Sequence, residues 1–117
     1  MTKRIMVIED NEDILDLMRY ILEEDGYTII AGRDSKPLRE IHVHQPDLIL
    51  MDNRLTDGSG NNFCRTLKND PSTSHLPVVL VSANADVADM ASDCRADAYL
   101  SKPFNVADLL ELVRRFV

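Results

Sequence analysis

Short apolar runs and amphipathic segments alternate along the 117-residue chain. The runs are rich in Val, Ile and Leu and occupy residues 4–9, 27–31, 47–51, 78–82 and 98–101. Between them, apolar residues recur three and four positions apart, a spacing typical of a helix. The clearest such series is Ile14, Leu17, Met18, Ile21 and Leu22. Runs that are apolar on both sides are typical of strands buried in a parallel sheet. The pattern therefore predicts five strand–helix units.

Polar residues that can cap a helix precede four of the amphipathic segments: Asn11, Ser35, Asn84 and Asn105. The predicted helices run from 12 to about 25, from 35 to 44, around 61–68, from Asn84 through Cys94, and from Asn105 to the last residue. Five alternating units in this length fit an α/β flavodoxin-like three-layer sandwich, with five helices around a parallel sheet of order 2-1-3-4-5. We expect one domain over residues 1–117.

Composition narrows the classes of function. The net charge is −7, the basic residues are scattered, and the aromatic residues are three Tyr and three Phe with no Trp. These features argue against direct nucleic-acid binding, which usually needs a basic face. No apolar run approaches the ~20 residues that span a bilayer, and the N-terminus lacks the apolar segment of a signal peptide. We therefore expect a cytoplasmic protein with no membrane partner.

The two cysteines match neither a CxxC motif nor a metal-ligand spacing. Cys94 shares a helical face with Val87, Met90 and Ala91. Its thiol is therefore expected in the core.

Polar residues follow four of the five predicted strands. They are Glu9 and Asp10 after the first, Asp52 after the third, Ser82 at the end of the fourth, and Ser101, Lys102 and Pro103 after the fifth. The second strand, at the sheet edge, ends in Ala31-Gly32 and offers no evident functional group. Because the carboxyl ends of parallel strands meet at one edge of the sheet, we expect these side chains to gather there.

The acids in this group need compensating positive charge. Three carboxylates about 5 Å apart repel by about 3 kcal/mol per pair at an effective dielectric near 20. Lys102 supplies one positive charge, and a divalent ion would supply the rest. Only oxygen ligands are available, which favours Mg²⁺, or Mn²⁺ in its place, over Zn²⁺. A carboxylate nucleophile, a metal, a hydroxyl and a cation together suit phosphoryl transfer to Asp52.

Four segments carry a family resemblance over essentially the whole chain: VIEDN (7–11), DLILMDNRLTDGSG (47–60), VVLVSA (78–83) and DAYLSKPF (97–104). In this order and spacing they resemble the receiver domain of two-component response regulators. The resemblance implies that Asp52 accepts a phosphoryl group from a phosphohistidine of a sensor histidine kinase or histidine phosphotransfer protein. It also implies that Asp10, Asp52 and the backbone carbonyl of Arg54 bind Mg²⁺, with Glu9 acting largely through water.

The resemblance extends to the response after phosphorylation. Ser82 and Lys102 would contact the phosphoryl oxygens, and Tyr99 would turn inward as Ser82 moves. The face made by the fourth helix, fifth strand and fifth helix would then change for a downstream protein target. The Lys102–Pro103 peptide bond would be cis. Arg54 and Asn84 stand at positions that tune the dephosphorylation rate in the family, and Thr56 replaces a frequent Pro.

Several functions remain open on the sequence alone. The leading hypothesis is a stand-alone receiver that catalyses only its own phosphorylation and dephosphorylation and is not otherwise an enzyme. A receiver-fold binding module independent of phosphorylation is a second reading, and a receiver excised from a larger regulator is a third. An aspartate-nucleophile phosphatase is a fourth. It is disfavoured because such enzymes carry DxD on the first strand, whereas Asp52 follows the third strand with Arg54 in the second acid's place.

Overall fold

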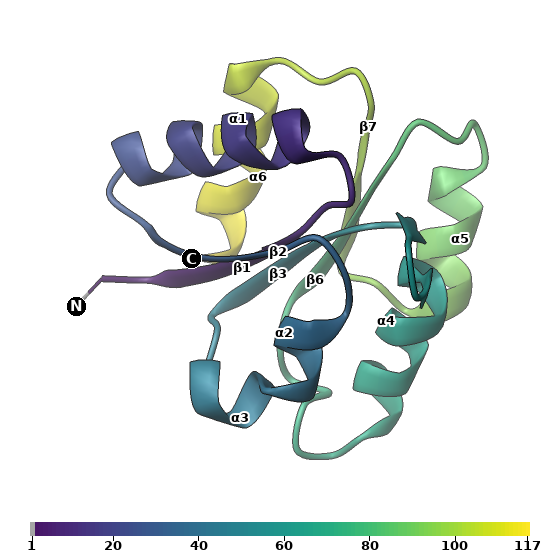
Figure 1. Cartoon of the computed structure of the whole chain (residues 1–117). Helices are drawn as coiled ribbons and strands as arrows, with labels where there is room; N and C mark the ends of the chain where they lie inside the picture. The colour runs from purple at the N-terminus through teal and green to yellow at the C-terminus, as the bar shows by residue number, and fades with distance from the viewer. Residues whose placement is uncertain (1) are drawn as a thin grey trace.

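The structure, a computed structural model, describes residues 2–117 and is built on one five-stranded parallel sheet (Figure 1). Its strands are β1 (Arg4–Ile8), β2 (Thr28–Gly32), β3 (Leu48–Asp52), β6 (Val78–Ser82) and β7 (Ala98–Ser101). They lie in the order β2-β1-β3-β6-β7, with all neighbours parallel. The predicted fold class and strand order are confirmed.

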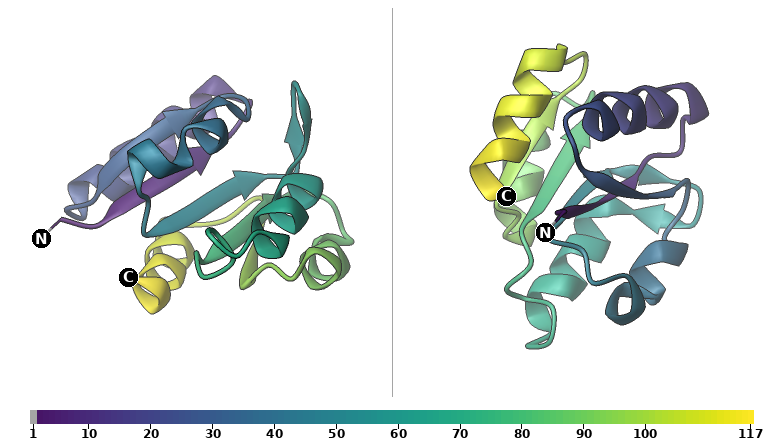
Figure 2. Two further views of the ribbon diagram at one scale, coloured as in Figure 1. Left: turned by 90° about the horizontal axis from the view of Figure 1, so that it is seen from below. Right: turned by 90° about the vertical axis from the view of Figure 1, so that its left-hand side faces the viewer.

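Helices cover both faces of the sheet (Figure 2). They are α1 (Glu12–Glu24), α2 (Lys36–Arg39), α3 (Ile41–His44), α4 (Gly60–Asn69), α5 (Val87–Cys94) and α6 (Val106–Phe116). α1 and α6 pack on one face, and α2 to α5 lie on the other. Successive side chains of a strand point to opposite faces, so β3 sends Leu48 and Leu50 into one core and Ile49 and Met51 into the other.

The helix predicted over 35–44 is wrong in its continuity, because the chain forms two helices of four residues there. Glu40 separates them with φ −110° and ψ 25°, which is outside the α-helical region. Only Pro37 and Ile41 of these helices are buried, so little packing holds a longer helix together. The described residues therefore contain six helices where five were predicted.

Three of the four predicted cap residues stand at helix starts, and two of them make the side-chain capping bond. The Asn11 side chain accepts a hydrogen bond from the Ile14 backbone N–H, and Asn105 caps α6 in the same way. Ser35 stands at the start of α2 but makes no capping bond. Asn84 is not the cap of α5: its side chain accepts from the Asp86 backbone N–H, which forms a turn before the helix begins at Val87. Local side-chain bonding of this kind competes with helix initiation.

Both cysteines lie in the core between α4 and α5. Cys64 and Cys94 are fully buried, and the Cys64 thiol donates to the Cys94 backbone carbonyl at 3.4 Å. Burial raises the pKa of the Cys64 thiol, with the neighbouring Cys94 adding to the rise. The expected core role of Cys94 is confirmed.

A two-stranded hairpin, β4 (Arg54–Leu55) and β5 (Gly58–Ser59), follows β3 directly. Figure 2 (left) shows it standing out from the end of the sheet. At Gly60 the chain returns so close that a Cβ would overlap the Asp52 backbone carbonyl oxygen. Only glycine fits this return.

None of the helices among residues 2–117 has both the length and the apolar character that a membrane span requires.

Candidate functional site

Three carboxylates meet where β1 and β3 end. β1 and β3 pair Ile8 with Met51, so the next residues, Glu9 and Asp52, lie side by side. Glu9 is 2% exposed and Asp52 is 7% exposed, whereas Asp10 is partly exposed. Oxygens of Glu9, Asp10 and Asp52 all lie within 4.8 Å of one another. The parallel sheet thus forces acids together that would separate in a flexible chain.

Lys102 brings a positive charge to this cluster. Its ammonium group forms an ion pair with Glu9 and lies 3.6 Å from Oδ1 of Asp52. The Lys102 backbone N–H donates to the Ser82 carbonyl at 2.9 Å, which places the residue directly after the β6–β7 pairing. The Lys102–Pro103 peptide bond is cis, the geometry that the resemblance implies.

An open cavity of about 290 Å³ lies over Asp52 and contains most of the predicted site residues in its lining. These are Asp10, Asp52, Arg54, Ser82, Asn84 and Lys102, together with Ala83. Glu9 is absent from the lining because it lies beneath, paired with Lys102. The Ser82 hydroxyl oxygen accepts from the Asn84 backbone N–H at 3.0 Å, which leaves the hydroxyl hydrogen free to donate.

The pKa values of Asp52 and Asp10 shift in opposite directions. Burial raises the pKa of the Asp52 carboxyl to about 7, and Asp10 and Glu9 add to the rise while Lys102 opposes it. Burial also acts to raise the pKa of Asp10, but hydrogen bonding with Asp52 and Glu9 and the charge of Lys102 together leave it lowered. Near neutral pH, in the absence of a metal, Asp52 is therefore only partly ionised, whereas Asp10 is ionised.

The donor set suits a hard divalent cation. Three carboxylates within mutual reach offer only oxygen, and a cation among them would replace the proton held by Asp52. No His or Cys belongs to the cluster. The residues present therefore fit Mg²⁺ or Mn²⁺ better than Zn²⁺.

Tyr99 lies apart from the cavity, on β7. Its residue surface is 46% exposed, and it borders a shallow pocket of about 200 Å³ that also involves Asp108, Glu111 and Arg115 of α6. In this structure the ring thus faces the α6 side of the molecule and is open to solvent.

Sequence reasoning missed a set of contacts at the end of the edge strand. The Arg33 guanidinium donates to the backbone carbonyl of Asp10, and Ser35 donates to the Asp57 carboxylate at the tip of the hairpin. The Asp57-Gly58 pair was a signal for a hairpin turn. No pattern in the sequence connects Asp57 with Ser35, 22 residues earlier.

The sheet order and the chemistry gathered at its carboxyl edge are those of a receiver domain, a phosphoacceptor module of signalling pathways. The family model described as the response regulator receiver domain matches residues 5–114, and the chain belongs to that family.

Relatives agree over the full length. The chain is 36% identical to the polar-differentiation response regulator DivK of Brucella ovis and of Brucella abortus, over all of this chain and 98% of theirs. A receiver domain protein described as CheY-like, from Methanospirillum hungatei, has a TM-score of 0.88 at 27% identity and covers 98% of this chain and 93% of its own. The receiver domain of a histidine kinase from Syntrophus aciditrophicus gives 0.90 at 28%, covering 98% and 89%. These relatives place the chain in two-component signalling.

Proposed function

We propose that this receiver is a phosphorylation switch in which Asp52 accepts a phosphoryl group from the phosphohistidine of a sensor histidine kinase or a histidine phosphotransfer protein. The supporting observation is the convergence of Asp10, Asp52, Ser82 and Lys102 on one cavity. An ionised Asp52 oxygen attacks phosphorus, the phosphorus–nitrogen bond breaks, and the imidazole of the donor leaves with the bond's electron pair.

Each side chain has a defined role in that step. Lys102, 3.6 Å from Asp52, offsets the charge of the transferring group, and the Ser82 hydroxyl donates to a phosphoryl oxygen. Asp10, Asp52 and the backbone carbonyl of Arg54 would hold Mg²⁺, with Glu9 acting largely through water. When bound, Mg²⁺ would offset negative charge on the phosphoryl oxygens and keep Asp52 ionised.

The response passes to the face formed by α5, β7 and α6. The Lys102 backbone N–H donates to the Ser82 carbonyl at 2.9 Å. Movement of Ser82 toward a phosphoryl group therefore also displaces the backbone at Lys102, directly after β7. Tyr99, half exposed on β7, moves inward into the space that Ser82 leaves. The changed face then binds a downstream protein target or supports onward phosphotransfer. Arg54 and Asn84, which are exposed and line the cavity, set the lifetime of the phosphoryl group by controlling the approach of water.

Intact-mass measurement after incubation with acetyl phosphate and Mg²⁺ tests the proposal. We expect one added phosphoryl group on the wild type and on the control Asp70→Asn. None is expected on Asp52→Asn, and none on the wild type in the presence of EDTA. Wild-type protein that stays unmodified would overturn phosphotransfer and favour a binding module independent of phosphorylation.

A further inference from the structure

The short segment between β2 and α2 touches both loops that carry the proposed metal ligands. From one side, Arg33 reaches the loop after β1: its Nε and Nη2 donate to the Asp10 backbone carbonyl at 3.2 and 3.1 Å. Its Nη1 also lies 3.7 Å from the Glu12 carboxylate. Two donors thus converge on the carbonyl of a residue whose side chain is a proposed metal ligand.

On its other side the same segment holds the hairpin after β3. The Ser35 backbone N–H lies 3.1 and 3.3 Å from the two Asp57 carboxylate oxygens, and the Ser35 hydroxyl donates to the same carboxylate. Arg39 adds a positive charge 3.7 Å from Asp57 and donates to Ser35 at 3.3 Å. Ser35 is only 4% exposed, so its position is well defined.

The hairpin transmits this anchorage to Arg54. Asp57 lies at the turn between β4 and β5, whose pairing places Arg54 opposite Ser59. At its base, the Gly60 backbone N–H donates to the Asn53 carbonyl at 2.8 Å. The backbone of Arg54 is thus held between the end of β3 and the anchored tip.

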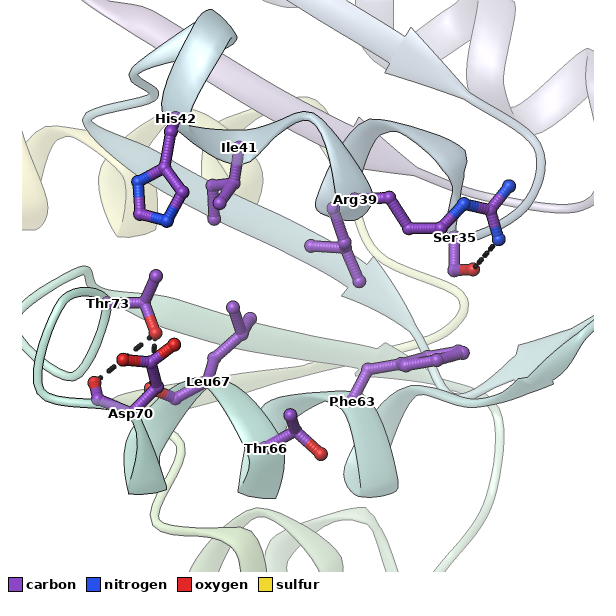
Figure 3. A pocket seen from close by; sticks show the side chains of 10 residues that line it. Ser35, Arg39, Ile41, His42, Phe63, Thr66, Leu67, Asp70 and Thr73 are labelled. Carbon is purple, nitrogen blue, oxygen red and sulfur yellow. Dashed lines mark hydrogen bonds between the residues drawn. The ribbon is translucent and has the colours of Figure 1, made fainter.

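Packing between α2–α3 and α4 is incomplete. A cavity of about 290 Å³ separates these helices from α4, as Figure 3 shows for Ile41 and His42 on one side and Phe63 and Leu67 on the other. Pro37 and Ile41 pack into the core, and the polar contacts of Ser35 and Arg33 add to this packing in holding the segment against both loops.

We propose that residues 33–35 act as a clamp that sets the distance between the Asp10 loop and the Arg54 hairpin, with Arg33 and Asp57 as positioning residues for the metal site. The clamp itself is a feature of the metal-free protein, and its effect on Mg²⁺ rests on the function proposed above. This clamp lies at the edge strand, away from Ser82 and Lys102.

Variants Arg33→Met and Asp57→Ala remove one anchor each. Each matched control makes the same kind of substitution, Arg to Met or Asp to Ala, at a position outside the clamp. Arg19→Met breaks an exposed ion pair with Glu23, and Asp70→Ala breaks carboxylate bonds to the backbone N–H and hydroxyl of Ser72. Asp57→Asn keeps one acceptor for Ser35, so it should recover part of the loss.

Hydrogen exchange in metal-free protein is the first measurement. We expect hairpin amides at residues 59–61 to exchange about tenfold faster in Asp57→Ala than in wild type, with Asp57→Asn in between and the controls unchanged. Calorimetric titration with MgCl₂ is the second. We expect the Kd to rise about three- to tenfold in Arg33→Met and Asp57→Ala, less than the ten- to hundredfold typical of residues that orient a ligand directly. Thermal unfolding verifies that each variant is folded.

Unchanged amide exchange would overturn the clamp. A Kd that matches the controls would overturn its effect on the metal site, as would a wild type that binds no Mg²⁺. A wild type that binds Mg²⁺ more tightly than the clamp variants yet accepts no phosphoryl group would overturn the proposed function alone.

Discussion

Asp52 and Asp57 lie five residues apart in the chain, yet their surroundings act on them in opposite directions. Asp52 is buried at the end of β3 beside two other acids, and its pKa rises to about 7. Asp57 is exposed at the hairpin tip, where the Ser35 hydroxyl, the Ser35 backbone N–H and the charge of Arg39 lower its pKa. The first needs a cation to become fully ionised near neutral pH, whereas the second is ionised without help.

The contrast separates two uses of one side chain. A carboxylate that is costly to ionise can exchange its proton for a metal ion and then serve as a nucleophile. A carboxylate that is already ionised and hydrogen-bonded, such as Asp57, can instead hold a loop in place. Two aspartates that are close in the sequence can therefore have different roles, because the groups around each carboxyl in the folded protein determine whether it is ionised.

Removing the neighbouring cation should produce the largest difference between the two regions. Lys102→Met leaves Glu9 buried without its partner, and we expect the free energy of unfolding to fall by about 3 kcal/mol. Arg39→Met removes the cation beside Asp57 and should change it by less than about 0.5 kcal/mol, because that pair is exposed. Urea unfolding at neutral pH without Mg²⁺ compares them. Equal losses would show that the acid cluster is well solvated.

Neutralising the buried acid should stabilise the metal-free protein. Folding raises the pKa of Asp52 from 3.8 to about 7, so the folded state binds more protons and wild-type stability declines as pH rises across that range. Asp52→Asn has no such group, and its advantage should grow from pH 4 to 7 and then level at about 4 kcal/mol. Thermal unfolding from pH 4 to 8 in EDTA measures this, and an advantage that shrinks as pH rises would contradict it.

Neutralising the exposed acid should have the smallest effect and the opposite sign. The folded-state pKa of Asp57 is lowered, so its contribution is present above the unfolded value of 3.8 and is lost as pH falls through the folded value. Asp57→Asn should therefore be slightly less stable than wild type at pH 6, and this deficit should disappear in acid. Denaturant unfolding at pH 6 and below pH 3 tests it. A deficit that persists unchanged in acid would contradict the assignment.

The strands and the residues that end them could be predicted from the sequence because a strand buried on both faces appears as a short continuous run of apolar residues. Such runs identified all five strands of the main sheet to within a residue or so at each end. The topology of a parallel sheet then implied that Asp10, Asp52, Ser82 and Lys102 would share one edge, and they line one cavity.

The contacts of residues 33–35, between β2 and α2, could not be predicted in the same way. Contacts such as Ser35 with Asp57 join loop residues that follow no period, and they depend on where the hairpin turns. The break at Glu40 and the displaced start of α5 have a similar cause, since weak packing and a local turn at Asn84 outweigh the helical pattern.

The buried cysteine pair gives the chain a built-in reporter of its own opening. Cys64 and Cys94 are fully enclosed between α4 and α5, and the raised pKa of the Cys64 thiol keeps it in the unreactive protonated form. A thiol reagent can then react only during moments when these two helices part. The rate of thiol labelling would therefore report how often α4 and α5 separate, without any engineered probe.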